Sequence, residues 1–289
     1  MLFQRVFSIL TIAAILSLAG VTACSSSVET PTPSTALATG THTQPVPTFM
    51  PTITATATPR PLTATPDIDA PVCSPLEGIA LNDLSKILSN PLATPHPGLD
   101  DGHHGIDLAF YRYGERTTMR GLPVYSVLPG VVASVVNNRP PYGNMVLIET
   151  PLEMLSPRQI QRLDLPEIEP TQQPGPAMVC PTLNAKIPVN SQRSLYFLYA
   201  HMESKPAIQV GESVSCGTKL GGVGTTGMSV NEHLHLEARI GPAGEHFEGM
   251  AFYDTGASSE EMANYCRWRA SQTFQLLDPL ETLLTLENY

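Results

Sequence analysis

Basic side chains are scarce in this sequence. Its 289 residues include 16 Lys and Arg against 26 Asp and Glu, which gives a formal net charge of −10 at pH 7. A nucleic-acid surface needs basic residues clustered in a patch or stripe, and the sequence has no such cluster. We therefore expect no nucleic-acid partner. The mild acidity itself indicates little more than a soluble domain.

Cysteine is also rare, and its spacing argues against two kinds of site. Apart from Cys24 there are four cysteines, and no two of them form the C-x-x-C pair that is typical of thiolate zinc sites. In an exported protein an even number predicts two disulfides, and the sequence leaves all three pairings open. A cysteine nucleophile at Cys180 or Cys216 is the weaker rival. The four residues are Cys73, Cys180, Cys216 and Cys266.

Only the N-terminus contains a long apolar run. Residues 6–19 follow Arg5 and are too short for a confident membrane-spanning helix, so residues 1–23 are predicted to be a signal peptide. The run ends in VTAC, which resembles the lipobox of bacterial lipoproteins. That resemblance implies lipidation of Cys24, with an ordinary signal peptide or an uncleaved anchor as alternatives. All three interpretations place the rest of the chain outside the cytoplasm.

The next stretch lacks any periodic apolar face. Residues 25–70 contain 13 Thr and 8 Pro and a single basic residue, Arg60. Such a composition cannot bury enough apolar surface to offset the entropy lost on ordering. We predict that residues 24–70 form a disordered tether and that residues 71–289 form one domain. Within that domain, residues 151–193 and 242–275 are interpreted as insertions.

Helices are missing between the apolar runs of the predicted domain. Short β-rich runs occur at 123–138, 142–150, 194–201 and 233–240. This spacing predicts a mainly β fold with an antiparallel sheet or half-open, barrel-like sandwich, and it excludes a doubly wound fold. Small helical insertions are expected at residues 258–275, which begin with a capping box, and for about one turn from Ser156.

The segment HLHLEARI, residues 233–240, alternates strictly between polar and apolar side chains. Because successive side chains of a strand point to opposite faces, it predicts a half-buried strand. His233 and His235 then share the polar face with Glu237. The Gly-rich stretch before it, GGVGTTG, contains a G-x-G-x-x-G pattern but leads into a strand rather than a helix, so we expect no dinucleotide site.

Two other segments contain residues that can bind metal. In GHHGIDLAF, residues 102–110, an extended backbone puts His103 and Asp107 on one face and turns His104 away. A straight strand would separate the first two by about 13 Å, and Gly105 would let the chain bend between them. In YAH, residues 199–201, His201 ends an apolar strand.

The order H-x-G-x-D, a strand that ends in YAH, a Gly-rich turn and HLHLE resembles the lysostaphin-type (LytM-like) zinc metallopeptidases. These bacterial envelope enzymes have the duplicated hybrid motif fold and cut peptidoglycan peptides. The resemblance covers roughly residues 98–241 and 276–284, with LPVYSVLPGVV, YGNMVLIE and LLDPLETL as matching framework. The family's Phe-Gly-x-Arg lead-in before His103 is missing, so one wall of the substrate groove departs from the family pattern.

The resemblance implies a complete site. His103, Asp107 and His235 would bind Zn²⁺, and His201 and His233 would be the catalytic histidines. Two imidazoles and one carboxylate leave zinc an open position for water. Histidine can transfer protons near neutral pH. For Glu237 two interpretations stay open, a partner that supports a histidine and a member of a salt bridge.

Taken together, the sequence predicts a zinc-dependent endopeptidase that hydrolyses stem or bridge peptides of peptidoglycan. We expect it to be monomeric and held by lipidated Cys24 at the outer face of the cell membrane. The alternative is a non-catalytic envelope module that binds the wall or activates another hydrolase. Members of that kind lose some metal-site residues, whereas this sequence has all five.

Overall fold

The computed structural model describes residues 68–167, 174–176, 178–182 and 192–287. The predicted signal peptide, Cys24 and nearly all of the predicted tether lie outside these residues. All described residues belong to one compact unit, Arg60–Tyr289. None of the helices within the described residues combines the length and apolarity that a membrane span requires.

An antiparallel sheet forms the centre of the fold. Among the described residues eight strands pair, in the order β1-β2-β9-β6-β5-β4-β7, with β10 also paired to β9. The sheet is not closed, so the predicted mainly β, antiparallel and half-open architecture is confirmed. Its strands are β1 (Leu88–Asn90), β2 (Ile106–Leu108), β4 (Gly130–Arg139), β5 (Gly143–Pro151), β6 (Arg193–Met202), β7 (Ser213–Val214), β9 (Leu234–Pro242) and β10 (Gln275–Leu277).

A small second sheet and short helices complete the described part of the chain. The second sheet pairs β3 (Pro123–Tyr125) with β8 (Lys219–Gly222). The helices are α1 (Pro157–Arg162), α2 (Ser259–Arg269) and α3 (Pro279–Glu287), together with the 3₁₀ turns η1 (Leu81–Ile87) and η2 (Leu152–Met154).

The two predicted helical segments are present, but one is shorter than expected. Ser156 caps α1 and Ser258 caps α2, each through a complete capping box. The expected helix over 258–275 ends at Arg269. Gln272 adopts a left-handed backbone with φ of 63°, which a right-handed helix cannot include. The chain then enters β10 beside β9.

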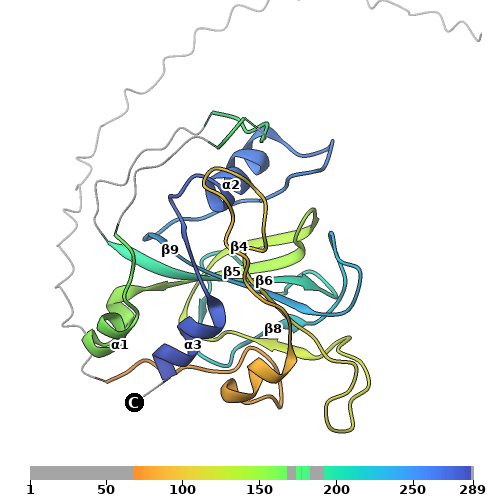
Figure 1. Cartoon of the computed structure of the whole chain (residues 1–289), viewed down its shortest axis with the longest axis vertical. Helices are drawn as coiled ribbons and strands as arrows, with labels where there is room; N and C mark the ends of the chain where they lie inside the picture. Colours follow the sequence, from red (N-terminus) through yellow and green to blue (C-terminus); the bar gives the residue numbers. More distant parts are fainter. Residues whose placement is uncertain (1–67, 168–173, 177, 183–191, 288–289) are drawn as a thin grey trace, which may run out of the picture. The chain divides into compact units, whose positions relative to one another are not determined.

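Helices cover both faces of the sheet. One hydrophobic cluster includes Leu286 of α3 and the apolar row of β9, with Ile160 of α1 packed against it. A second cluster on the other face includes Trp268 of α2 and the β6 residue Tyr196. Figure 1 accordingly shows α2 on one side of the central strands and α1 and α3 on the other.

The prediction of a half-buried β9 strand is therefore wrong in one respect. The alternation assigns the faces correctly, because Leu234, Leu236, Ala238 and Ile240 all lie in the first cluster. The polar face, however, is covered by α2 and its neighbours, and both Glu237 and Arg239 are buried. Polar side chains at such a depth need partners, because an unpaired buried polar group is costly.

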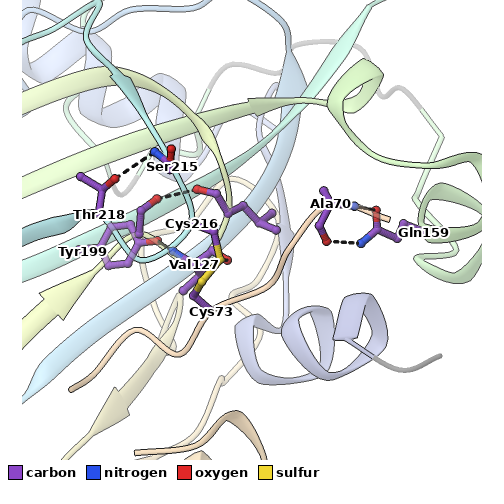
Figure 2. The surroundings of a disulfide bond; sticks show 10 residues. Ala70, Cys73, Val127, Gln159, Tyr199, Ser215, Cys216 and Thr218 are labelled. Carbon is purple, nitrogen blue, oxygen red and sulfur yellow. Dashed lines mark hydrogen bonds between the residues drawn. A yellow bond between two sulfur atoms is a disulfide. The ribbon is translucent and has the colours of Figure 1, made fainter. Parts of the chain in front are cut away.

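The four cysteines of the domain form two disulfides, as the even count predicts. Cys73 bonds to Cys216, and Cys180 bonds to Cys266. The first lies beside the first cluster, where the Cys73 amide donates to the carbonyl of Val127 and the Val127 amide donates to the Tyr199 hydroxyl (Figure 2). The second joins Cys180, in the segment predicted to be an insertion, to α2. Both bonds remove the thiol that a cysteine nucleophile requires.

Candidate metal centre and active site

Strand register places two of the predicted ligands opposite each other. Asp107 of β2 pairs with His235 of β9, and His235 also pairs with Ala200 of β6. His103 lies just before β2, and the backbone bends at residues 104 and 105, as expected from the glycine. A Cβ at Gly105 would lie 2.3 Å from the Leu236 carbonyl oxygen, so this close approach requires glycine.

The side chains of His103, Asp107 and His235 converge on one point. His103 Nε2 lies 3.1 Å from Asp107 Oδ1 and 3.2 Å from His235 Nδ1, and the last two atoms lie 2.9 Å apart. Ligand bonds of about 2.0–2.2 Å around a tetrahedral zinc would set such atoms roughly 3.3 Å apart. The three atoms therefore have the spacing of a zinc ligand set.

Hydrogen bonds on the far side of the His103 and His235 rings fix both residues in the tautomer that can bind a cation. His103 Nδ1 lies 2.9 Å from the Pro91 carbonyl oxygen and must donate to it. His235 Nε2 faces the Glu237 carboxylate at 3.3 Å and donates likewise. A neutral imidazole has one N–H, so in the neutral rings the nitrogens that face each other both present lone pairs toward Asp107, whereas a protonated ring donates to Asp107 as well. A bound cation relieves this repulsion, and the residues present fit zinc.

The charge states of these ligands respond to the same contacts. Burial raises the pKa of Asp107, but hydrogen bonds with His103 and His235 outweigh it and hold the pKa well below its usual range. Burial lowers the pKa of His235, but its hydrogen bonds with Asp107 and Glu237 outweigh that effect and raise the pKa. Because metal binding needs the neutral imidazole, acid conditions compete with the metal at this residue.

His201 reaches the same site through an unusual backbone. The β5–β6 register shifts between Asn144 and Val146, opposite the end of β6, and His201 has a φ of 60°. This left-handed conformation is rare for a residue with a side chain, and bulges of this kind redirect side chains near functional sites. His201 Nδ1 lies 2.8 Å from the Thr226 carbonyl oxygen. Burial lowers the pKa of His201 to about 3, so the ring is neutral at neutral pH.

His233 has a matching arrangement. Its Nδ1 lies 2.9 Å from the Asn231 carbonyl oxygen, while its Nε2 lies 3.4 Å from Asp107 Oδ1. The rings of His201 and His233 are neighbours, with centroids 4.8 Å apart. In both residues Nδ1 donates to a carbonyl, which leaves Nε2 as the nitrogen that can accept a proton at the metal site.

A cleft of about 450 Å³ gives solvent access to this cluster. Its lining includes residues of the loop before β9, and it also includes Asp100 together with Tyr253, Tyr265 and Arg269 from residues 242–275. Asp100 holds these three side chains together, because it accepts hydrogen bonds from both tyrosine hydroxyls and from Arg269 Nε at 2.6–2.7 Å. Asp100 lies in the segment before His103, where the sequence lacks the family's Phe-Gly-x-Arg lead-in.

The structure brings all five sequence-predicted site residues to one cleft, while their assigned roles stay predictions. Sequence reasoning missed the groups that orient them. Asn90 Nδ2 donates to Asp107 Oδ2 at 3.1 Å, and the carbonyls of Pro91, Thr226 and Asn231 fix three histidines. Backbone carbonyls leave no residue-type signature, so no sequence pattern could have identified them.

The remaining histidines of the described residues lie away from the metal centre. His104 points away from His103 and Asp107, as predicted, and is buried between the Asp101 carbonyl and Arg239. His96 and His246 are exposed. The Gly-rich stretch before β9 enters a strand, and no helix follows it, in agreement with the prediction that it is not a dinucleotide loop.

Comparison with known proteins agrees with this geometry. The family model of Peptidase family M23 matches residues 182–248, which include His201, His233 and His235. The match confirms the resemblance to the lysostaphin-type family and supports a peptidase. No curated protein matches the sequence.

Three similar solved structures have related descriptions. A putative peptidase M23 from Pseudomonas aeruginosa is 18% identical, with 58% of this chain and 48% of that chain covered and a TM-score of 0.27. The catalytic domain of lysostaphin from Staphylococcus simulans is 18% identical, with 71% and 98% covered and a TM-score of 0.36. A zinc containing peptidase from Vibrio cholerae is 20% identical, with 60% and 37% covered and a TM-score of 0.32.

These likenesses concern the fold alone. The chain spans about half the length of the Pseudomonas aeruginosa protein and nearly all of the lysostaphin catalytic domain. With every TM-score below 0.5, the functional argument depends on the geometry of the site and on the family match.

Proposed function

We propose that this protein is a zinc-dependent endopeptidase that hydrolyses peptide bonds of bacterial cell-wall peptidoglycan. The observation that carries the proposal is the convergence of His103, Asp107 and His235, with their three ligand atoms 2.9–3.2 Å apart beside a solvent-accessible cleft. The match to a peptidase family supports the reaction class. The sequence motifs resemble those of the lysostaphin-type metallopeptidases, and this resemblance supports peptidoglycan as the substrate.

The chain's own residues account for substrate positioning and proton transfer. When bound, zinc provides a Lewis acid that polarises the scissile carbonyl and lowers the pKa of a coordinated water toward about 7. His201 and His233 present Nε2 to the same cleft, where one can accept a proton from the attacking water and return one to the leaving amide nitrogen. The buried position of both rings limits their motion during this transfer.

The side chains that line the cleft favour a peptide substrate. Met228, Val230 and Tyr253 are exposed, and all three line the cleft. Exposed apolar and aromatic side chains beside the polar and charged groups of the same cleft suit a peptide whose backbone carbonyl must reach the metal.

The decisive experiment uses purified protein and isolated peptidoglycan. We expect stoichiometric zinc and release of new amino and carboxyl ends, identified by mass spectrometry. His103→Ala and Asp107→Ala should abolish both zinc binding and release, whereas His246→Ala, at an exposed position away from the cleft, should retain both. Full activity after removal of zinc by a chelator would contradict the proposal. Stoichiometric zinc without turnover would favour the non-catalytic envelope module instead.

We also propose that the protein is exported and anchored by a lipid at Cys24, outside the described residues. The proposal is supported by the apolar N-terminal run and the VTAC motif. A tether of residues 24–70 would let the domain reach a polymer that lies away from the membrane. Membrane fractionation of the expressed protein tests this, because Cys24→Ala should move the mature protein from the membrane fraction to the soluble fraction.

A further inference from the structure

Glu237 is the most heavily bonded side chain next to the candidate metal centre. It has no exposed surface, and its neighbour on the same face of β9 is the ligand His235. His235 Nε2 donates to Glu237 Oε1 at 3.3 Å. The carboxylate therefore sets both the tautomer and the ring orientation that aim His235 Nδ1 at the metal position.

Four further donors hold this carboxylate in place. Tyr142 donates its hydroxyl at 2.7 Å, and Arg239 donates from Nε at 3.1 Å. The other two come from α2, where Trp268 Nε1 donates at 2.8 Å and Arg269 Nη1 donates at 3.1 Å. Hydrogen bonds from charged or rigid donors restrict a carboxylate strongly, because moving it would break several bonds in a buried site.

The charges of the side chains around Glu237 balance one another without the metal ligands. Arg239 and Arg269 face the carboxylates of Glu237 and Asp100. Glu237 therefore lies against two guanidinium groups, and its orientation depends on a helix that lies outside the residues matched by the peptidase family model.

We propose that α2 is a positioning element for the metal centre, in which Trp268 and Arg269 hold Glu237 and Glu237 holds His235. The metal affinity of this protein then depends on its helical insertion. This inference rests on the proposed metal site and does not require peptidase activity. The two α2 residues act through Glu237, since their bonds to the metal centre run through its carboxylate.

The test measures zinc affinity by competition with a chromophoric chelator, at constant pH, in the full exported chain. Glu237→Gln should weaken zinc binding about 10–100-fold, and Trp268→Phe should weaken it by about 10-fold, at the lower end of the range for such supporting residues. Trp268→Phe keeps an aromatic ring in place and removes the indole donor together with part of the ring volume.

Tyr196→Phe is the matched control. Tyr196 is as buried as Trp268 and packs edge-on against it, but its hydroxyl donates to the Pro242 carbonyl instead of Glu237. It should lose stability to a similar degree and keep the zinc affinity of the unmodified protein. If Glu237→Gln fails to fold, the comparison of Trp268→Phe with Tyr196→Phe decides alone.

Three outcomes separate the possibilities. Weaker zinc binding in Trp268→Phe but not in Tyr196→Phe supports the inference. Unchanged binding in Trp268→Phe, or an equal loss in both variants, overturns it. Peptidoglycan turnover by the unmodified protein is measured in parallel. If Trp268→Phe binds zinc more weakly but the unmodified protein shows no turnover, the inference holds and the proposed peptidase function is wrong.

Discussion

The two faces of β9 are buried to a similar degree but by different means. On one face, Leu236 and Ile240 lie in an apolar cluster under η1 and α3. On the other, Glu237 lies under α2 and His235 lines the cleft, and both contact charged and hydrogen-bonding groups. The apolar face gains stability from surface removed from water. The polar face gains little net stability from its bonds and instead requires each group to have a partner.

This comparison indicates that burial alone does not distinguish core from site. A substitution on the apolar face should lower the free energy of unfolding and leave metal binding intact. A substitution on the polar face should change metal binding or catalysis first. Each of the following predictions tests that division, beginning with the largest expected effect.

His235 of β9 and His233, which lies just before the strand, should respond differently to substitution. His235→Ala removes a ligand and should eliminate both zinc binding and peptidoglycan hydrolysis. His233→Ala should retain zinc and reduce the rate of hydrolysis by about 10²–10⁴-fold, the usual contribution of a proton-transfer residue. Zinc content by elemental analysis and the release rate of muropeptides measure the two effects. Loss of zinc in His233→Ala would show that both residues are ligands and would overturn the assignment.

Ile240→Ala tests the apolar face. Ile240 is 1% exposed and lies in the first cluster, so truncation should lower the free energy of unfolding by about 2–5 kcal/mol. Urea unfolding of the chelator-treated protein measures this loss. Zinc affinity, determined on protein that is still folded, should equal that of the unmodified chain. A large decrease in affinity would mean that the two faces are coupled through the strand.

The two disulfides offer a second contrast between the faces. Each double Cys→Ser variant should lose about 2–5 kcal/mol of stability, because both bonds close long loops in the unfolded chain. Removing Cys73–Cys216, beside the apolar cluster, should leave zinc affinity unchanged. Removing Cys180–Cys266 should also weaken zinc binding, because Cys266 belongs to α2. Equal zinc affinity in both double variants would argue against a role for α2 at the metal centre.

His104 should produce the smallest effect, visible in the pH dependence of stability. Burial, followed by Arg269 and Arg239, lowers the pKa of His104 to about 2. In the unfolded chain the pKa returns to about 6.5, so below that pH the unfolded state binds a proton that the folded state does not. Stability therefore falls as the pH is lowered through 6.5.

His104→Gln isolates this contribution. Between pH 7 and pH 5, the unmodified protein should lose about 2 kcal/mol more stability than the variant. Both are measured by urea unfolding without zinc, so that metal release does not contribute. An identical pH dependence of the two proteins would show that His104 is protonated in the folded state.

The sequence by itself determined the local features of this protein. The two-residue period of HLHLEARI assigned the faces of β9, and the turn residues marked the other strands, because backbone geometry fixes where neighbouring side chains point. The capping box at Ser258 located the start of α2, and Pro157 at the first helical position marked the start of α1. The residue types of the five site positions, together with their order along the chain, predicted the family before any contact was known.

Only the tertiary structure decided which distant residues meet. His103 and His235 are 132 positions apart, and their contact depends on the register between β2 and β9. The left-handed backbone of His201 and the pairing of the four cysteines likewise depend on packing between separate segments. The packing of α2 over Glu237 likewise depends on contacts between separate segments. Local sequence fixes directions over a few residues, whereas these contacts follow from the pairing of strands and the closure of long loops.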